Sequence, residues 1–383
     1  MERMIALVDC DSFFVACEQV INPELEGKPV CVLSNNNGCI VSRSKEAKTR
    51  GVKMGAPYFL AKREFKDVIF ITGKKDLYKE ISNKVMTKLK TYSPLVEVYS
   101  IDEAFIDLTG TSKLYNKSYE DIVKMIREEV KAETGITVSI GLAGSKTLAK
   151  LGSDKAKSNG GIFVIEPEDI HYLLKDTRIE EIWGIGRQLC KKLARKGILT
   201  AFELISKPDT VLKSLLGVVG LRLKHELLGV CTSPVNPIEE APQSIQQTEA
   251  LKDFSSDKTY IKTALNRHIH KACAKLRKYG LLTSNVGVML RTKDFQVISL
   301  TQELTESTNF EFEIQKVAYE LFDKIFNPNI IYRSTGVYLG DFQNEANKQL
   351  TLLDSDSDKK ESLARCIDKI ESKFGKNSIR TGY

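Results

Sequence analysis

Two carboxylates stand side by side in a segment that otherwise has the composition of a buried strand. Residues 98–108 read VYSIDEAFIDL, so bulky and β-branched residues flank Asp102 and Glu103 and favour a half-buried sheet. Adjacent negative charges in such a place repel each other and lose hydration. A cation would compensate both costs, and hard divalent cations such as Mg²⁺ prefer carboxylate oxygens. The segment predicts either a cation site or, as the plainer interpretation, an exposed acidic turn.

The geometry of a strand limits how these two acids can act together. Neighbouring side chains of an extended strand point to opposite faces of the sheet. Asp102 and Glu103 can therefore converge only where the chain turns or bulges. We expect residues 95–100 and 104–108 to form the two arms of a hairpin, with the acids at its tip.

A second acidic pair follows the first apolar run of the chain. Residues 4–9 (MIALVD) predict a buried strand, and Asp9 and Asp11 lie at its end, where strand spacing places both on one face. Spacing alone does not choose between them. Two metal ions about 3.5–4 Å apart can activate an attacking hydroxyl and stabilise the leaving oxygen in phosphoryl transfer. Acids at a strand end and at a hairpin tip together predict such a site.

The elements that would position these acids alternate between strand and helix up to Pro167. Apolar runs predict strands at residues 30–33, 39–41, 68–71, 136–142 and 162–165, and helical spacing predicts helices at residues 13–20, 44–50, 77–89, 122–130 and 145–157. Asp11 or Ser12 can cap the first helix, and Asn35-Asn36-Asn37-Gly38 predicts a turn. This half of the chain is therefore expected to be mixed α and β.

The pattern changes after Pro167. Residues 168–230 predict helices, and the three prolines of residues 231–243 predict a linker. Strands at residues 244–248, 286–290 and 334–339 with helices at residues 261–279 and 312–325 predict a small α+β module, and the polar tail from residue 344 is weakly helical. His268 and His270 face apart on a helix, which favours ordinary core and surface roles for them.

Bulk composition narrows the class of protein. The formal net charge of +7 indicates an anionic partner only weakly. The eight cysteines form no CxxC pair, which disfavours a zinc ribbon. No apolar run approaches the roughly 20 residues of a membrane span, and Asp9 interrupts the region where a signal peptide would continue. We expect a cytoplasmic protein with no membrane partner.

Four motifs occur in a fixed order along the chain. They are DCDSFF (Asp9–Phe14), SRSKEAKTRGVKMG (Ser42–Gly55), SIDEAFIDL (Ser100–Leu108) and GLAGSKTLAKLGSDKAKSNG (Gly141–Gly160). Together they resemble the Y-family of translesion DNA polymerases. The NNNGC run and the SKEAK segment resemble the UmuC subgroup, the catalytic subunit of bacterial DNA polymerase V. The likeness extends from residue 4 to about residue 353.

The resemblance implies a multidomain α+β architecture of the right-hand polymerase type. The implied parts are a palm at residues 1–14 and 77–166, fingers at 15–76, a helical thumb with a helix-hairpin-helix at 167–232, a linker at 233–243, an α+β little finger at 244–343 and a tail at 344–383.

The resemblance also implies site residues. Asp9, Asp102 and Glu103, with the Cys10 carbonyl, would hold two Mg²⁺ ions, and Asp11 would instead cap the next helix or orient local backbone. Phe14 falls at the steric gate, which excludes a ribose 2′-hydroxyl. The implied nucleotide contacts are Phe13, Phe14, Ser42, Lys45, Lys48 and Lys157, with Lys146 and Lys150 as secondary candidates. Lysines stand at positions 45 and 48 where the family commonly has tyrosine and arginine, and they lack the bidentate fork.

Contacts to DNA and to the sliding clamp are implied further along. Gly184, Gly186 and Lys191 in the segment WGIGRQLCKK resemble the thumb hairpin, where glycine N–H groups approach a DNA phosphate. The little finger would grip duplex DNA through its backbone, with no sequence preference. Past it, a glutamine followed by spaced apolar residues resembles a clamp-binding peptide, comprising Gln349, Leu350, Leu352 and Leu353.

The implied function is low-fidelity, template-directed DNA synthesis past lesions. Its substrates would be primer–template DNA and deoxyribonucleoside triphosphates, and its partners a UmuD-type subunit, RecA and the sliding clamp, acting on the bacterial nucleoid in the SOS response. Two alternatives stay open. Another palm-type metal phosphotransferase, such as a nucleotide cyclase, would not need the thumb hairpin. A non-catalytic DNA-binding paralogue should have lost a metal carboxylate, yet all three are present.

Overall fold

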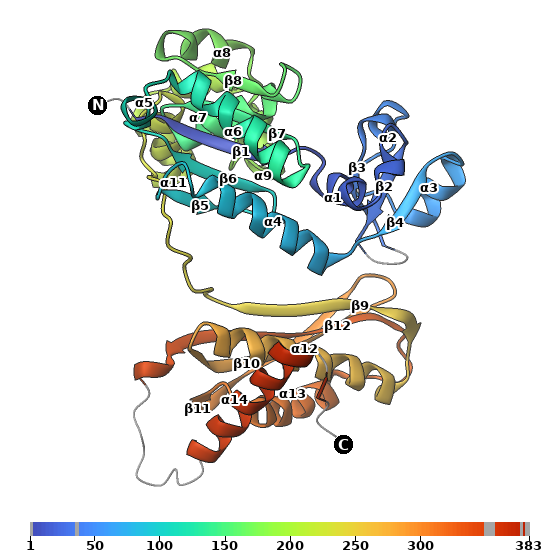
Figure 1. Ribbon diagram of the computed structural model, residues 1–383. Helices are drawn as coiled ribbons and strands as arrows, with labels where there is room; N and C mark the ends of the chain where they lie inside the picture. The colour runs from blue at the N-terminus through green and yellow to red at the C-terminus, as the bar shows by residue number, and fades with distance from the viewer. Residues whose placement is uncertain (1–2, 35–37, 348–356, 376–377, 380–383) are drawn as a thin grey trace. The chain divides into compact units, whose positions relative to one another are not determined.

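The computed structural model describes residues 3–34, 38–347, 357–375 and 378–379 (Figure 1). Its contacts divide the chain into two units, Met1–Glu239 and Glu240–Tyr383. The division falls inside the segment 231–243 for which the sequence predicts a linker. No helix among the described residues combines the length and the apolar character that crossing a bilayer requires.

A five-stranded sheet forms the centre of the first unit. Its strand order is β5 (Val96–Val98), β6 (Glu103–Asp107), β1 (Ile5–Cys10), β7 (Val138–Ala143) and β8 (Ile162–Val164). Strand β1 is the middle strand and pairs antiparallel with both neighbours. All six of its residues are buried, which explains why the sequence there is a continuous apolar run. The predicted first strand and the predicted 95–108 hairpin are both present.

Helices cover both faces of this sheet. On one face, Ala6 and Val8 share a core with α1 (Phe13–Ile21), α4 (Lys75–Leu89) and α6 (Tyr119–Thr134). On the other face, Ile5 and Leu7 pack with α7 (Lys146–Ala156) and the helices that follow it. Alternate residues of β1 therefore serve two separate cores, as a strand's period of two requires. A short helix, α5 (Thr111–Tyr115), follows β6.

Helix α7 lies directly against β7 because a glycine permits it. A Cβ atom added at Gly141 would come within 2.1 Å of both the Ala149 carbonyl oxygen and the Ser153 backbone nitrogen. No larger residue fits that gap without moving the helix. The close approach brings the lysine side chains of α7 to the strand ends that carry the acids.

A smaller sheet follows α1. Its strand order is β3 (Ile40–Arg43), β2 (Val30–Leu33) and β4 (Ile69–Thr72), and α2 (Lys45–Thr49) and α3 (Tyr58–Glu64) complete it. It has a separate small core that contains Leu33, Ile40 and Val52. The predicted Asn35–Asn37 turn lies outside the described residues.

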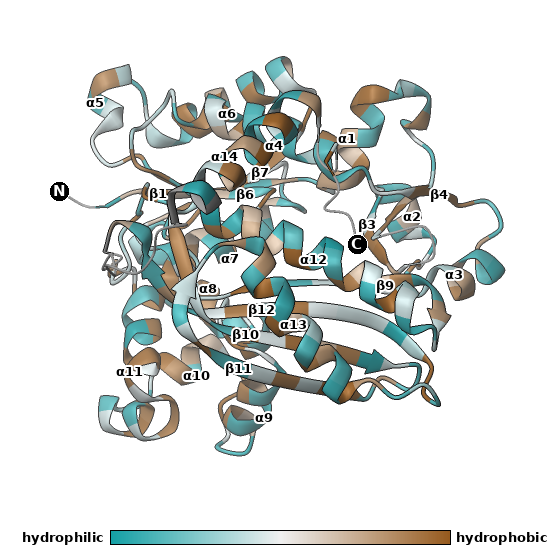
Figure 2. Ribbon diagram, turned by 90° about the horizontal axis from the view of Figure 1, so that it is seen from below, coloured by the Kyte–Doolittle hydropathy of each residue, from teal (hydrophilic) through white to brown (hydrophobic). Residues whose placement is uncertain are grey.

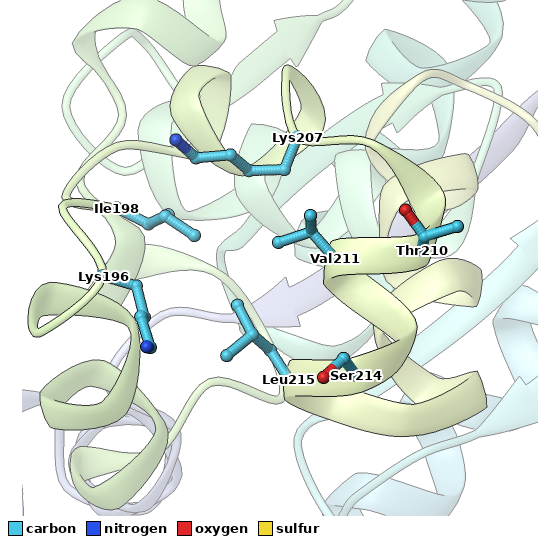
Figure 3. A pocket seen from close by; sticks show the side chains of 7 residues that line it. All are labelled: Lys196, Ile198, Lys207, Thr210, Val211, Ser214 and Leu215. Atoms are coloured by element: carbon cyan, nitrogen blue, oxygen red, sulfur yellow. The ribbon is translucent and has the colours of Figure 1, made fainter.

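The region after β8 is helical, as predicted. It comprises α8 (Ile170–Asp176), α9 (Arg187–Ala194), α10 (Ala201–Ile205) and α11 (Asp209–Leu227), with 3-10 turns at Pro167–Asp169 and Ile179–Glu181. A pocket of about 510 Å³ lies between the end of α9 and the start of α11 (Figure 3). Polar side chains of Lys196, Lys207, Thr210 and Ser214 surround its apolar residues, among them Val211 and Leu215.

The second unit is a four-stranded antiparallel sheet with helices on one face. Its strand order is β11 (Val297–Thr308), β10 (Leu281–Thr292), β12 (Tyr332–Asn344) and β9 (Ile245–Ser255). Helices α12 (Lys258–Lys278) and α13 (Glu311–Ile325) share one core with the sheet and carry hydrophilic residues on their outward sides (Figure 2). The tail helix α14 (Ser357–Phe374) joins α12 through paired hydrogen bonds of 2.7 and 2.6 Å from Arg277 to Asp368.

Strand β11 corrects the sequence prediction, which left residues 297–308 without an element. The strand lies at the edge of the sheet and most of its side chains are exposed. Its threonines, glutamates and serines outnumber its apolar residues. An edge strand pairs with only one neighbour and buries few of its side chains, so it needs few apolar residues.

Candidate active site

Asp9 and the adjacent pair Asp102 and Glu103, which are far apart in the sequence, lie at the same end of the five-stranded sheet. Asp9 on β1 is directly opposite Glu103 on β6 in the antiparallel register. The Cys10 backbone N–H donates to the Asp102 carbonyl oxygen at 2.9 Å, which joins the next residue of β1 to the hairpin tip. Asp9 is only 6% exposed. The structure thus places Asp9 and Glu103 on adjacent strands and Asp102 in the turn just before β6.

The three carboxylates differ in what they contact. The Asp102 carboxylate accepts a hydrogen bond from the Ser100 hydroxyl, which in turn accepts one from the Asp102 N–H at 3.2 Å. Asp9 and Glu103 instead face two lysines. Across the described ranges of the chain, no three His, Cys, Asp or Glu side chains already converge as a ready-made metal cage. The acids therefore lie as one pair plus one neighbour held locally by its own turn.

Two lysines of the α7 segment lie on the paired acids. The Lys150 ammonium contacts Asp9 Oδ2 at 3.3 Å and also contacts the Glu103 carboxylate. The Lys157 ammonium lies 3.0 Å from Asp9 Oδ2 and 3.0 Å from Asp154 Oδ1. Two positive charges therefore occupy the place where the sequence predicts cations.

Lys150 lies closer to the acids than the sequence predicts, where it is only a secondary candidate. Residues 146, 150 and 157 share one face of a helix by spacing, but spacing does not show which of them reaches the acids. Lys146 does not, because its ammonium lies 2.5 Å from Glu97 and its side chain is almost fully buried.

Burial and charge act against each other on the paired acids. Burial alone would raise the pKa of Asp9, but the hydrogen bond with Glu103 and the charges of Lys157 and Lys150 together hold that pKa below its ordinary value. The pKa of Glu103 is raised by burial and by its hydrogen bond with Asp9, against the opposing effect of Lys150. The pair thus divides into a strong acid and a weak one, as expected for adjacent carboxylates. Despite burial, the neighbouring carboxylates raise the pKa of Lys157.

The start of α1 differs from the sequence prediction. Ser12 has a left-handed backbone (φ 49°) and its side chain makes no capping hydrogen bond, and Asp11 accepts a hydrogen bond from the Ser139 hydroxyl at 2.7 Å instead. The cap predicted from Asp11 or Ser12 is therefore wrong. Asp11 ties the β1 exit to β7, and it contacts none of the three acids through a described hydrogen bond.

Ser12 also anchors two predicted nucleotide-binding side chains. The Lys48 ammonium donates to the Ser12 hydroxyl at 2.9 Å, and the Ser42 hydroxyl donates to the Ser12 carbonyl at 3.1 Å. Burial lowers the pKa of Lys48, and the charges of Arg43 and Lys157 lower it further. Lys45, at the first position of α2, is exposed.

The adjacent rings of Phe13 and Phe14 have different surroundings. Phe13 is 3% exposed and belongs to the main core. Phe14 is only partly buried and stacks on Tyr78, with ring centroids 4.8 Å apart. The Tyr78 hydroxyl donates to buried Glu18 at 2.7 Å, which fixes the ring behind Phe14. Of the two rings, only Phe14 keeps part of its surface exposed.

The predicted thumb hairpin has accessible backbone. Gly184 has a φ of +88°, which favours glycine, and a Cβ atom at Gly184 or Gly186 would meet nothing within 4 Å. Gly186 is the N-cap of α9, which contains Lys191. Next to the hairpin, the Trp183 indole N–H donates to the Tyr99 hydroxyl at 3.1 Å, so the hairpin is joined to the strand pair that carries Asp102. The predicted clamp-binding residues, Gln349, Leu350, Leu352 and Leu353, lie outside the described residues.

Comparisons with known proteins identify the family of the chain. Residues 8–154 match the impB/mucB/samB family, and residues 242–352 match the C-terminal domain of the same family. Protein UmuC of Salmonella typhimurium is 33% identical over 98% of this chain and 92% of its own length. The chain belongs to the impB/mucB/samB family. Its relatives include DNA polymerase IV 1 of Bacillus subtilis, 32% identical over 99% of this chain and 92% of that protein.

Solved structures of this family have the same fold. A chimeric Y-family DNA polymerase made from Dbh and Dpo4 is 27% identical, with a TM-score of 0.75 over 89% of this chain and 99% of that one. An insertion ternary complex of Dbh DNA polymerase has a TM-score of 0.60 over 89% of this chain and 99% of that one. The predictions of a Y-family polymerase fold, of the UmuC-type likeness and of DNA-directed DNA polymerase activity are confirmed. Enzymes of this family are metal-dependent nucleotidyltransferases.

Proposed function

We propose that Asp9, Asp102 and Glu103 are the catalytic acids of a low-fidelity polymerase that copies damaged templates. The observation that supports this most directly is the register of Asp9 opposite Glu103, with the Cys10–Asp102 hydrogen bond beside it. This places oxygen ligands from two rigid strands at one sheet edge. Sites built on strands hold their geometry better than sites on loops.

The donor set fits two Mg²⁺ ions. Mg²⁺ takes oxygen ligands, usually one or two carboxylates together with substrate phosphates, and the three acids and the Cys10 carbonyl offer that chemistry. The contacts of Lys150 and Lys157 with Asp9 show that the pair already attracts positive charge. When bound, the ions would lower the pKa of the primer hydroxyl and neutralise the triphosphate.

The residues of the chain would act mainly by positioning and charge. Lys157 and Lys48 would bind triphosphate oxygens, with Lys157 exchanging its contact with Asp9 for one with the substrate. Asp9, Asp102 and Glu103 would orient the reacting groups so that the primer oxygen, the α-phosphorus and the leaving pyrophosphate are in line. The ring of Phe14, held by Tyr78, would exclude a 2′-hydroxyl.

DNA would be held by two separate surfaces. The N–H groups at Gly184 and Gly186 would bind a backbone phosphate, with Lys191 adding charge. The second unit would contact the duplex backbone, which carries no sequence information and weakens with salt. Tolerance of damaged bases would follow from weak selection of base shape.

Primer extension with Mg²⁺ on intact and damaged template tests the acids. Asp102→Ala should abolish extension while DNA binding is retained, because it removes one of the three carboxylates proposed to hold the metal ions. Asp67→Ala is the matched control, since it removes an acid that is paired with Arg50 on the surface of the same unit. Extension by Asp102→Ala at the wild-type rate would refute the site.

The sugar preference tests Phe14 independently. Phe14→Ala should raise incorporation of ribonucleotides, because the ring edge no longer occupies the space of the 2′-hydroxyl. The change is measured as the ratio of kcat/KM for deoxyribonucleotide and ribonucleotide. An unchanged ratio would remove the gate assignment and leave the acids unaffected.

The partners are proposed from the family resemblance and, for the clamp, from the motif at residues 349–353. A UmuD-type subunit, RecA and the sliding clamp would act with the chain on nucleoid DNA in the cytoplasm, with residues 349–353 as the clamp-binding peptide. Co-purification with a tagged clamp, compared between the wild type and a Gln349→Ala, Leu352→Ala double variant, tests the last assignment. Equal recovery of the two proteins would contradict it.

A further inference from the structure

An arginine of the second unit lies between two exposed phenylalanines. The Arg333 guanidinium is 3.7 Å from the ring centroid of Phe295 and 5.3 Å from that of Phe254. Phe254 belongs to β9, Arg333 to β12, and Phe295 to the turn between β10 and β11. We call these three residues the aromatic platform. Three separate segments of the chain therefore contribute to one cationic, aromatic cluster.

The platform exposes more apolar surface than a core contact would. Phe295 is 64% exposed and Phe254 is 49% exposed. An isolated exposed ring needs no explanation, but a cluster of exposed rings marks a binding surface. Arg333 makes this cluster suitable for a flat, electron-rich ligand, because guanidinium groups stack on planar π-systems.

The backbone of Phe295 is strained. Its φ is +68°, a conformation that bulky residues rarely adopt and that costs roughly 1–2 kcal/mol. The turn is held by a hydrogen bond from the Phe295 N–H to the Thr292 carbonyl at 3.0 Å and by one from the Gln296 N–H to the Thr292 hydroxyl at 3.2 Å. Glycine or asparagine would suit this position better for folding, so the ring has a purpose other than stability.

The sequence repeats around the platform. The tripeptide Lys-Asp-Phe occurs at residues 252–254 and again at residues 293–295, so each ring follows the same lysine–aspartate pair. The basic residues of this region are Lys252, Lys293, Arg291 and Arg333, and its acidic residues are Asp253 and Asp294. The register of β9 on β12 also shifts between residues 332 and 334. Such irregularities often re-aim side chains beside functional sites.

The sheet face opposite the helices carries small and polar residues near its middle. Val286, Val288 and Leu290 of β10 point into the core under the helices, so the residues between them face the other side of the sheet. Thr301 and Thr248 lie on that side and contact the positions of Gly287 and Gly336. Threonines and glycines therefore share that face with Met289 and Tyr338.

We propose that the aromatic platform stacks an unpaired nucleobase of single-stranded DNA, with Lys252 and Lys293 contacting the flanking phosphates. Aromatic stacking combined with lysines along the backbone is the general means by which proteins hold single strands without sequence preference. Of the ligands that would cover these rings, a base suits both the planar guanidinium and the basic surroundings. The inference rests on the proposed DNA polymerase function, since it adds a contact to unpaired template.

The test compares two labelled oligonucleotides of equal length and charge, one all-thymine and one abasic, by fluorescence anisotropy with the full-length chain at one fixed salt concentration. Wild type should bind the thymine strand on the order of tenfold more tightly. Phe254→Leu, Phe295→Leu should lose most of that preference while its affinity for the abasic strand is unchanged. Leucine keeps apolar bulk but cannot stack.

Two further variants separate stacking from folding. Phe295→Gly removes the ring and the backbone strain together, so its melting temperature should equal or exceed that of wild type while the preference falls. Phe312→Leu is the matched control, because Phe312 is also exposed (40%) but lies on α13, outside the platform. It should keep the full preference.

Equal binding of the two strands by wild type, or a preference retained by both Phe295→Gly and the double variant, would overturn the proposal and assign the rings to a protein partner. Primer extension on the same preparations keeps the two proposals distinct. A ring-dependent base preference without extension would support the platform and contradict the polymerase site. Extension without any such preference would do the reverse.

Discussion

Each unit of the molecule contains a cluster of carboxylates and basic side chains, and the two clusters have opposite designs. In the first unit, Asp9 and Glu103 face Lys150 and Lys157 at a sheet edge. The side chains of Asp9, Glu103 and Lys150 are 8–18% exposed, and that of Lys157 is 42% exposed. In the second unit, His270 lies between Glu311 on α13 and Glu371 on α14, at 2.8 and 3.1 Å. There the side chains are 17% exposed or less.

The difference shows how placement decides the use of the same chemistry. Strand ends hold acids rigidly but leave one side open, so a substrate can replace the lysines. Acids on helix flanks that pack together are enclosed by their partners and can only hold the helices in place. The first cluster is therefore expected to determine activity and the second to determine stability.

Replacing one acid in each cluster should show the largest difference between the roles of the two clusters. Glu103→Gln should lower primer extension by about a thousandfold, because it removes a charge at the reacting centre, with the melting temperature almost unchanged. Glu311→Gln should lower the melting temperature by several degrees and leave extension within about twofold, as enzyme assays and calorimetry on both variants would show. A similar loss of activity in both would erase the distinction.

The packing of α7 offers a second way to disturb only the first cluster. Gly141→Ala places a methyl group against the helix backbone and should destabilise the first unit by about 3 kcal/mol, because the helix has to move away from β7. Lys150 and Lys157 would move with it, so extension should also fall. Chemical denaturation measures the loss. An unchanged midpoint would mean that the helix yields at no cost.

The pH dependence of stability should identify the second cluster. The hydrogen bond with Glu311 raises the pKa of His270 from 6.5 to about 9 against the effect of burial, with Glu371 contributing as well. A raised folded pKa gives stability that is complete below about pH 6.5 and is lost as the pH rises through about 9. Between about pH 6 and about pH 10, wild type should lose about 2 kcal/mol more than His270→Gln. Parallel denaturation curves would contradict this.

The smallest expected effect concerns a single lysine of the first cluster. Lys157→Ala should raise the KM for the incoming nucleotide about tenfold, since one contact to the triphosphate is lost, with a smaller change in kcat. Lys155→Ala is the control, because two residues along a helix turn the side chain to the other face. Steady-state kinetics distinguish the two. Equal KM values would show that Lys157 only neutralises Asp9.

The sequence predicted the elements that have strong periodicity. The apolar run of β1 and the helical repeats of α4 and α6 follow directly from burial of one stripe or of two faces. Edge strand β11 was missed because an edge needs few apolar residues. The hydrogen bonds of α14 could not be predicted, since Arg277 and Asp368 are 91 residues apart and nothing in their local sequence links them.

For the site, sequence motifs named the acids, and the fold showed how they are paired. The local pattern could not distinguish Asp9 from Asp11, because both follow the same strand. The structure separates them, as Asp9 faces Glu103 while Asp11 turns to Ser139. The role of Lys150 likewise depends on how closely α7 approaches the sheet at Gly141, which is a tertiary feature.

The ammonium groups of Lys150 and Lys157 make the acidic pair self-neutralised at rest. Unlike a zinc finger, whose fold is lost with its ion, this sheet edge carries its own counter-charges, so a chelator should stop synthesis without unfolding the protein. In the proposed reaction, an arriving triphosphate competes for Lys157 and thereby uncovers Asp9. Binding of the triphosphate would then, in the same step, free Asp9 to bind a metal ion. Without substrate, Asp9 would stay paired with Lys157, and the enzyme would not retain metal ions.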